Sequence, residues 1–299
     1  MGERLDALST ESHREGAEDL DRRSISELVE IMNAEDRTVP EAVGETREHI
    51  SAAVEAIVAR MERGGRMIYA GAGTSGRLGL LDAAECGPTF NTHPGQVVGL
   101  LSGGPEAALD PAENAEDDSE GGASEVDRIG VTENDVVVGV SASGRTPYVL
   151  GAVRRARERG ALTVGVACNQ PSELGRKVDH AIEVDTGPEV ISGSTRLKAG
   201  TAQKLILNTI STVTMIRLGK VFGDLMVDVR PTNEKLRRRA RRIVARAAGV
   251  SQPEADRALQ AADGEVKTAI VALLAEVEPD QARQRLKSAV GNIRVAMEP

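Results

Sequence analysis

The chain has 299 residues and a formal net charge of −9; 40% of its residues are hydrophobic, but only 1% are aromatic. This length allows one large domain or two smaller ones, with a core of aliphatic side chains and Met. The acidic balance and the scarcity of aromatic stacking platforms argue against a general nucleic-acid binder or a binder of anionic membranes.

Residues 1–23 are polar and show no periodic pattern, so we expect them to form a flexible arm. The chain opens without an apolar leader segment, and no apolar run is long enough to span a membrane, which favours a cytoplasmic protein with no membrane partner. Cys86 and Cys168 lie far apart and lack the spacing of metal ligands. We expect both to be buried, reduced thiols.

Helical periodicity begins at Ser24, which forms a candidate capping box with Glu27. A second helix is expected over 40–63, opened by Pro40 and carrying its apolar residues on one face. After this helix, the helical spacing of apolar residues gives way to the short continuous apolar runs of buried strands.

Short apolar runs predict five strands, and helical stretches such as 77–85, 147–159 and 197–218 lie between or after them. Near-continuous apolar strands that alternate with helices are typical of a parallel sheet covered on both faces. The sequence therefore predicts an α/β fold with a doubly wound parallel sheet, which binds ligands at the carboxyl ends of its strands. The predicted strands are 66–70, 97–101, 135–140, 162–167 and 181–184.

The composition shifts after residue 230, so we expect a main domain over 24–230 and a small helical appendage over 231–299. Further helices are expected near 251–262, 264–275 and 279–288. The segment from Lys235 to Arg246 holds seven basic residues. It also carries apolar residues at helical spacing, which favours an amphipathic helix with a solvated face over a nucleic-acid patch. These apolar residues are Leu236, Ala240, Ile243, Val244 and Ala247.

Three loops share a composition of Gly, Ser and Thr with one Arg: 71–77, 141–146 and 192–196. The first two connect a predicted strand to a predicted helix, and the third precedes the long helix expected over 197–218. Glycine lets backbone N–H groups approach an anion, a helix N-terminus adds positive potential, and hydroxyls donate to phosphate oxygens. The loops therefore predict a phosphate-binding site. No Walker-type Lys follows, so a nucleoside triphosphate is not implied.

The first loop also fits the spacing of the dinucleotide fingerprint, through Gly71, Gly73 and Gly76. No acidic residue stands out at the end of a second strand as the ribose ligand, which weakens this alternative. Plain turn glycines are the simplest interpretation of any single loop. Three hydroxyl-rich loops of one kind favour a shared binding role.

The loops resemble those of the sugar isomerase (SIS) fold, and longer segments are similar to the bacterial N-acetylmuramic acid 6-phosphate etherase family. The resemblance covers about residues 24–299. It departs from the family in the 1–23 arm, and we assign no role to positions near 91–94 and 111–114. The matching segments are GAGTSGRLG at 71–79, DAAEC at 82–86, AED at 115–117, SASGRTPY at 141–148, SGSTRLKAGTAQK at 192–204 and NEKL at 233–236.

The resemblance implies a flavodoxin-like SIS sandwich and a homodimer whose active sites are completed across the subunit interface. The implied activity is that of a lyase which removes the lactyl ether of N-acetylmuramic acid 6-phosphate. The products are N-acetylglucosamine 6-phosphate and D-lactate, in the recycling of cell-wall sugar. Neither a metal nor an organic cofactor is expected.

Cleaving an alkyl ether in this way requires two carboxyl groups with different protonation states. Opening the sugar to its aldehyde acidifies the proton on C2, a base removes that proton, and an acid protonates the departing C3 oxygen. Water then adds back at C3. By the resemblance, Glu85 is the acid and Glu116 the base; the division of roles between them stays open.

The loop chemistry and the resemblance also predict the side chains that bind substrate. Arg196 and Lys198 are left out of this set, because both residue types are mostly surface residues. For Asp82 we favour capping or ion pairing. Ser75, Ser141, Ser143 and Thr146 are expected at the phosphate, Ser192 and Ser194 at the sugar, and Thr74 is a further expected substrate-binding residue.

Two other functions are compatible with the loops. An aldose–ketose isomerase uses the same proton at C2, but it needs no acid at the C3 oxygen, so the second matched glutamate favours the lyase. A non-catalytic regulator could also sense a sugar phosphate with this fold, as the eukaryotic glucokinase regulatory protein does. Release of lactate separates the lyase from both alternatives.

Overall fold

A computed structural model of the chain describes residues 8–14, 16, 19–110, 114–229 and 234–298. The backbone divides into two compact units. The first comprises 1–84 and 95–211, and the second comprises 85–94 and 212–299.

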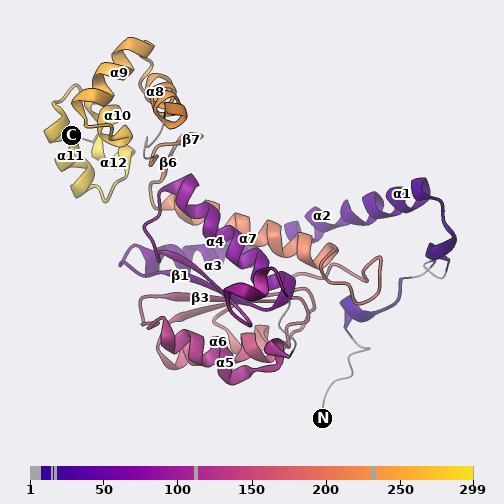
Figure 1. Cartoon of the computed structure of the whole chain (residues 1–299). Coiled ribbons are helices and arrows are strands. Elements are labelled where there is room, and N and C mark those ends of the chain that lie inside the picture. The colour runs from indigo at the N-terminus through magenta and orange to yellow at the C-terminus, as the bar shows by residue number, and fades with distance from the viewer. Residues whose placement is uncertain (1–7, 15, 17–18, 111–113, 230–233, 299) are drawn as a thin grey trace. The chain divides into compact units, whose positions relative to one another are not determined.

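The first unit contains a five-stranded parallel sheet in the order β2-β1-β3-β4-β5 (Figure 1). Every residue of β1, β3 and β4 is buried, as expected for strands covered on both faces. Each of the five strands lies within one residue of its predicted range. Their bounds are β1 Met67–Gly71, β2 Val97–Leu101, β3 Val136–Ser141, β4 Leu162–Ala167 and β5 His180–Glu183.

The strand order reverses direction between β1 and β3. β1 pairs with β2 on one side and with β3 on the other, so Met67 lies opposite both Val97 and Val136. The order 2-1-3-4-5 is that of flavodoxin-like sheets, whose ligands bind where the order reverses, at the carboxyl ends of the strands. The loops that follow β1 and β3 therefore flank the expected binding position.

Helices cover both faces of the sheet. α5 (Ser119–Arg128) and α6 (Pro147–Glu158) pack through Val126, Ala152 and Ala156 on the face that carries Ile68. Tyr69 points to the opposite face, which is covered by α3 (Arg47–Met61), the first part of α4 (Gly73–Phe90) and α7 (Lys198–Arg217) (Figure 1). The predicted α/β class with a doubly wound parallel sheet is confirmed.

Asp82 is buried on this second face and links three elements. Its carboxylate accepts hydrogen bonds from the Tyr69 hydroxyl at 2.7 Å, from the Asn208 amide at 2.6 Å and from the Ser211 hydroxyl at 3.1 Å. The expectation of capping or ion pairing was wrong. Three neutral donors, two of them on the distant helix α7, satisfy the buried carboxylate instead.

The N-terminal helices begin as predicted and then differ from the prediction. α1 (Ile25–Asp36) starts with the capping box between Ser24 and Glu27. The helix expected over 40–63 is in fact two helices, α2 (Thr38–Glu45) and α3. The break lies at Thr46, whose hydroxyl donates to the carbonyl of Val43 and closes the turn. Thr side chains compete in this way with the hydrogen bonds of a helix.

Short 3-10 turns also occur in the first unit. The ones that matter for the site are Ser9–Glu11, Pro105–Ala108 and Ala115–Asp117, and the others are Leu20–Arg22 and Gly175–Lys177.

The second unit has a core of its own, built from small aliphatic side chains. Its helix α8 (Glu234–Ala248) buries Ala240, Ile243 and Val244 and carries its basic residues elsewhere, which confirms the predicted amphipathic helix. No helix in the described part of the chain is long and apolar enough to cross a membrane. The other elements are β6 Val221–Phe222, β7 Leu225–Met226, α9 Gln252–Ala261, α10 Val266–Leu274, α11 Pro279–Ser288 and α12 Ile293–Ala296.

Candidate active site

The loop after β3 gathers three of the predicted hydroxyls. The Ser141 Oγ lies 2.8 Å from the Thr146 Oγ1 and 3.4 Å from the Ser143 Oγ. Thr146 is the N-cap residue of α6, whose first helical position is Pro147. The three hydroxyls therefore meet at a helix N-terminus, where the backbone already favours an anion.

Gly144 lets this loop close. Its φ of +67° lies in the left-handed region, and a Cβ added there would stand 2.5 Å from the Cβ of Ser172. The N–H of Gly144 donates to the Ser141 Oγ at 3.0 Å, and the N–H of Arg145 donates to the Ser143 Oγ at 3.2 Å. The backbone thus orients the same hydroxyls that would donate to a phosphate.

The loop after β1 runs into the first turn of α4. A Cβ on Gly76 would lie 2.5 Å from the carbonyl oxygen of Gly71, so this close turn requires glycine. Ser75 is buried, and its hydroxyl donates to the Oε1 of Gln203 on α7 at 2.9 Å. Thr74 also lies near α7, because a Cβ on Gly200 would be 3.5 Å from its methyl group. The first loop and the start of α7 are therefore neighbours.

The third loop differs from the other two, because it does not follow a strand directly. It leads into α7, whose first N–H groups, those of Lys198 and Ala199, donate to the Glu189 carboxylate at 2.9 and 3.0 Å. Ser192 is exposed and donates to the carbonyl of Glu11 at 3.3 Å, whereas Ser194 is half-buried. This loop thus contacts the N-terminal segment.

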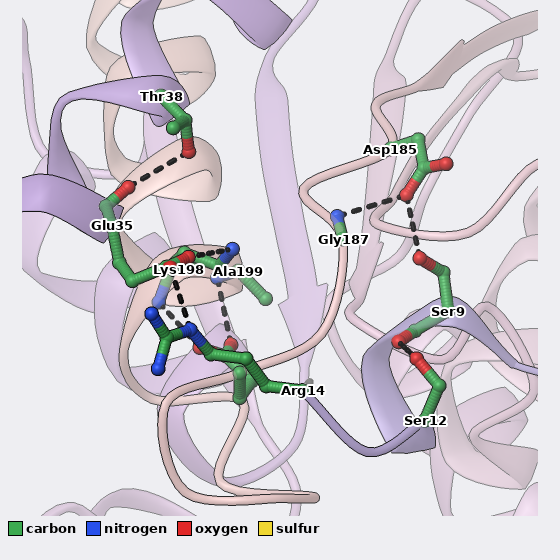
Figure 2. A network of polar contacts seen from close by, with 10 residues as sticks. Ser9, Ser12, Arg14, Glu35, Thr38, Asp185, Gly187, Lys198 and Ala199 are labelled. Carbon is green, nitrogen blue, oxygen red and sulfur yellow. Dashed lines mark hydrogen bonds and ion pairs between the residues drawn. The ribbon is translucent and has the colours of Figure 1, made fainter. Parts of the chain in front are cut away.

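Residues 8–14, within the segment expected to be a flexible arm, make specific contacts (Figure 2). Ser9 donates to the Asp185 carboxylate at 2.7 Å. Arg14 and the buried Lys198 both pair with Glu35 of α1, at 2.7 and 2.8 Å. Burial raises the pKa of Glu35, but the two cations outweigh it, so the net pKa lies below its ordinary value. These contacts hold α1 to the start of α7.

The two predicted catalytic glutamates are both exposed. Glu85 lies on α4, and Glu116 lies in the turn Ala115–Asp117 that precedes α5. Arg77 of the first loop donates to the carbonyls of Ala107 and Ala108, which anchors the chain shortly before Glu116. Asn233 of the NEKL segment and residues 111–113 lie outside the described residues.

Cysteine, histidine and carboxylate side chains are the groups of this chain that could bind a metal ion. Cys86 and Cys168 are both buried thiols, as expected. Among the described residues, no three His, Cys, Asp or Glu side chains cluster in a way that could hold a metal ion.

Sequence reasoning missed the residues that support the loops, namely Glu35, Glu189 and Gln203. The available signal for Gln203 was its place in the SGSTRLKAGTAQK segment, one turn after Ala199 on a predicted helix.

Comparisons with known proteins show which families this chain is similar to. The family model of the glucokinase regulatory protein N-terminal SIS domain matches residues 49–157, and that of the SIS domain matches residues 121–212. The N-acetylmuramic acid 6-phosphate etherase of Rubrobacter xylanophilus is 59% identical to this chain over 297 residues, covering 99% of this chain and 98% of the relative. The Streptomyces coelicolor enzyme of the same name is 57% identical, covering 98% and 94%.

Two solved structures share the fold. A putative phosphosugar isomerase involved in capsule formation from Bacteroides fragilis aligns with a TM-score of 0.52 and 20% identity, covering 67% of this chain and 95% of that one. Phosphoheptose isomerase from Neisseria gonorrhoeae aligns with a TM-score of 0.51 and 19% identity, covering 64% and 98%. At these identities the likeness concerns the fold alone.

Proposed function

This chain belongs to the N-acetylmuramic acid 6-phosphate etherase family, and from that premise we propose which of its side chains bind and cleave the substrate. The activity is that of a carbon–oxygen lyase, which splits the D-lactyl ether of N-acetylmuramic acid 6-phosphate into N-acetylglucosamine 6-phosphate and D-lactate. The observation that carries this conclusion is identity of 59% over nearly the whole length of both chains.

We place the substrate phosphate between the loops after β1 and β3. Ser141, Ser143 and Thr146 are gathered within hydrogen-bond distance at the N-terminus of α6, which supports this placement. A phosphate dianion accepts hydrogen bonds only, so it suits a group of hydroxyl and backbone N–H donors. Thr74 and Ser75 belong to the same site in this proposal, and Ser192 and Ser194 of the third loop would face the sugar ring.

Glu116 and Glu85 are assigned to the chemistry. Glu116 removes the C2 proton of the open-chain aldehyde, a double bond forms between C2 and C3, and the C3–O bond breaks. Glu85 protonates the departing oxygen, which completes D-lactate. Water then adds to C3 and gives its proton to the Glu85 carboxylate, while Glu116 returns a proton to C2. Each carboxyl group thus ends in its starting protonation state.

The reaction run in isotopically labelled water tests this route. Purified protein should release one D-lactate per substrate; H₂¹⁸O should place ¹⁸O at C3 of the product, and D₂O should place deuterium at C2. N-acetylglucosamine 6-phosphate kept in H₂¹⁸O without protein corrects for exchange at C1. Product that lacks label at C3, or lactate that carries it, would contradict elimination and rehydration.

The same assay separates the alternative functions. An aldose–ketose isomerase would yield a ketose phosphate and no lactate. A regulator that only senses a sugar phosphate would bind N-acetylglucosamine 6-phosphate and leave the lactyl ether intact. Folded protein that releases no lactate would therefore refute the lyase.

The proposal includes a homodimer whose active sites are completed across the interface. The apolar side of α1 supports it, because Ile25 is 83% and Val29 55% exposed, and no residue of this helix is buried in the single chain. Light scattering should give twice the 31.6 kDa mass of one chain. A single-chain mass at the concentrations of the activity assay would contradict it.

We further propose that the protein works in the cytoplasm. A phosphorylated sugar carries charge and does not cross a membrane unaided, so the enzyme and its substrate must share a compartment. The two buried thiols suit a reducing compartment.

A further inference from the structure

Gln203 connects the first loop to the end of β4. Its side chain is 1% exposed, and its Oε1 accepts the hydrogen bond from Ser75 at 2.9 Å. Its amide also lies beside the fully buried thiol of Cys168. Burial raises the pKa of that thiol, nearby Glu189 and Asp185 raise it further, and the Gln203 amide lowers it in part. Gln203 thus stands between a proposed phosphate ligand and a buried thiol.

One half of this amide is poorly satisfied. The Gln203 Nε2 is buried and makes no hydrogen bond of standard geometry among the described residues; the Cys168 sulfur, a weak acceptor, lies beside it. A buried amide N–H without a partner costs free energy comparable to a lost hydrogen bond, so such atoms are rare in folded proteins. The Cys168 thiol meanwhile donates to the carbonyl of Ala199 at 3.6 Å.

The hydrogen bond from Ser75 conflicts with its proposed role at the phosphate. A serine hydroxyl has a single proton to donate. When that proton points at the Gln203 Oε1, Ser75 can offer a phosphate oxygen only lone pairs, which repel it. Ser75 can bind phosphate only if its proton is released from Gln203.

We propose that Gln203 is the positioning residue that turns the Ser75 hydroxyl toward the substrate phosphate, by presenting Nε2 rather than Oε1 to Ser75. This inference rests on the proposed function of Ser75. A half-turn of the amide exchanges two groups of nearly identical shape. Nε2 then donates to the Ser75 oxygen, the Ser75 proton is available to the phosphate, and Oε1 can accept from the Cys168 thiol. The Gln203 Nε2, the Ser75 hydroxyl and the Cys168 thiol then each donate a hydrogen bond.

Binding of N-acetylglucosamine 6-phosphate, measured by isothermal titration calorimetry, tests this role. Gln203→Met keeps the length of the side chain but removes both hydrogen bonds, and it should weaken binding about tenfold. Gln203→Glu offers Ser75 only an acceptor and adds a negative charge, so it should weaken binding about 100-fold or more. Ser211→Ala, which removes a buried hydroxyl from the same helix, should change the affinity less than about twofold.

A double-mutant cycle separates positioning from a general effect on packing. In a Ser75→Ala background, Gln203→Met should weaken binding less than about twofold, because the hydroxyl that Gln203 orients is gone. In a Ser141→Ala background it should keep its full effect of about tenfold. An equal loss in both backgrounds, or none in the unmodified protein, would overturn the proposal.

Two further measurements keep the outcome clear. If Gln203→Met does not fold, as judged by thermal unfolding, the cycle is run with Gln203→Leu, which also removes both hydrogen bonds and adds no charge. If the unmodified protein fails to bind N-acetylglucosamine 6-phosphate, the proposed function is wrong. Normal binding with equal losses in both backgrounds refutes only the role of Gln203.

Discussion

Glu85→Gln is expected to lower kcat for lactate release by about 1,000-fold, while KM changes less than about threefold. A positioned general acid contributes roughly 10²–10⁴-fold to a rate, and an alkoxide is a poor leaving group without a proton. Glutamine keeps the size of the side chain and loses the transferable proton. The effect should therefore fall on kcat rather than on binding.

Comparison with Glu116→Gln decides how the two carboxyl groups divide the work. If Glu116 is the base, Glu85→Gln should still exchange the C2 proton of the substrate with D₂O, whereas Glu116→Gln should lose this exchange and lactate release together. The opposite pattern would reverse the two assignments. Glu120→Gln is the matched control, since Glu120 lies in the same acidic stretch and pairs at the surface with Arg154. It should keep activity within about twofold.

Asp135→Asn is expected to lower the free energy of unfolding by about 3 kcal/mol at pH 7, because it breaks a partly buried ion pair whose carboxylate is itself buried. The Asp135 carboxylate accepts from the side chain of Arg66 at 2.7 and 3.1 Å. It also accepts from the backbone N–H groups of Arg66 and Thr132, at 2.8 and 2.9 Å. This carboxylate therefore anchors the starts of β1 and β3.

The loss of unfolding free energy in Asp135→Asn should depend on pH. Burial raises the pKa of Asp135, but its hydrogen bonds with Arg66 and Thr132 outweigh burial, so the net pKa lies below its ordinary value. A carboxyl group whose pKa is lower in the folded state stabilises the fold at pH values above its unfolded pKa of about 3.9. This stabilisation is lost as the pH falls through the pKa of the folded state. The difference between the two proteins should stay constant from about pH 6 to 8 and shrink below about pH 4.

Urea unfolding at several pH values measures this difference. Asp280→Asn is the control, because its side chain is 89% exposed and pairs only at the surface with Arg283. It should change stability by less than about 0.5 kcal/mol. A difference for Asp135→Asn that does not vary with pH would show that the ion pair is not its cause.

Local patterns in the sequence predicted most of the fold. The apolar runs located all five strands of the sheet, because burial on both faces leaves a continuous signature in any short window. The capping box at Ser24 and Glu27 marked the start of α1 because both partners lie within one helical turn, so a short window of sequence contains the whole signal. Three similar loops predicted where hydroxyls gather, and the structure brings Ser141, Ser143 and Thr146 together.

The sequence by itself thus determined the parallel sheet, the hydroxyl-rich loops and, through its motifs, the family, whereas the catalytic roles of Glu85 and Glu116 stay a prediction. Only the tertiary structure decided which side chains support the loops. Ser75 meets Gln203 across 128 positions, and Ser9 meets Asp185 across 176. Asp82 likewise finds its donors on α7 rather than on its own helix. The physical reason is that a buried polar atom needs a partner, but no local pattern specifies which distant residue the packing of helices will bring to it.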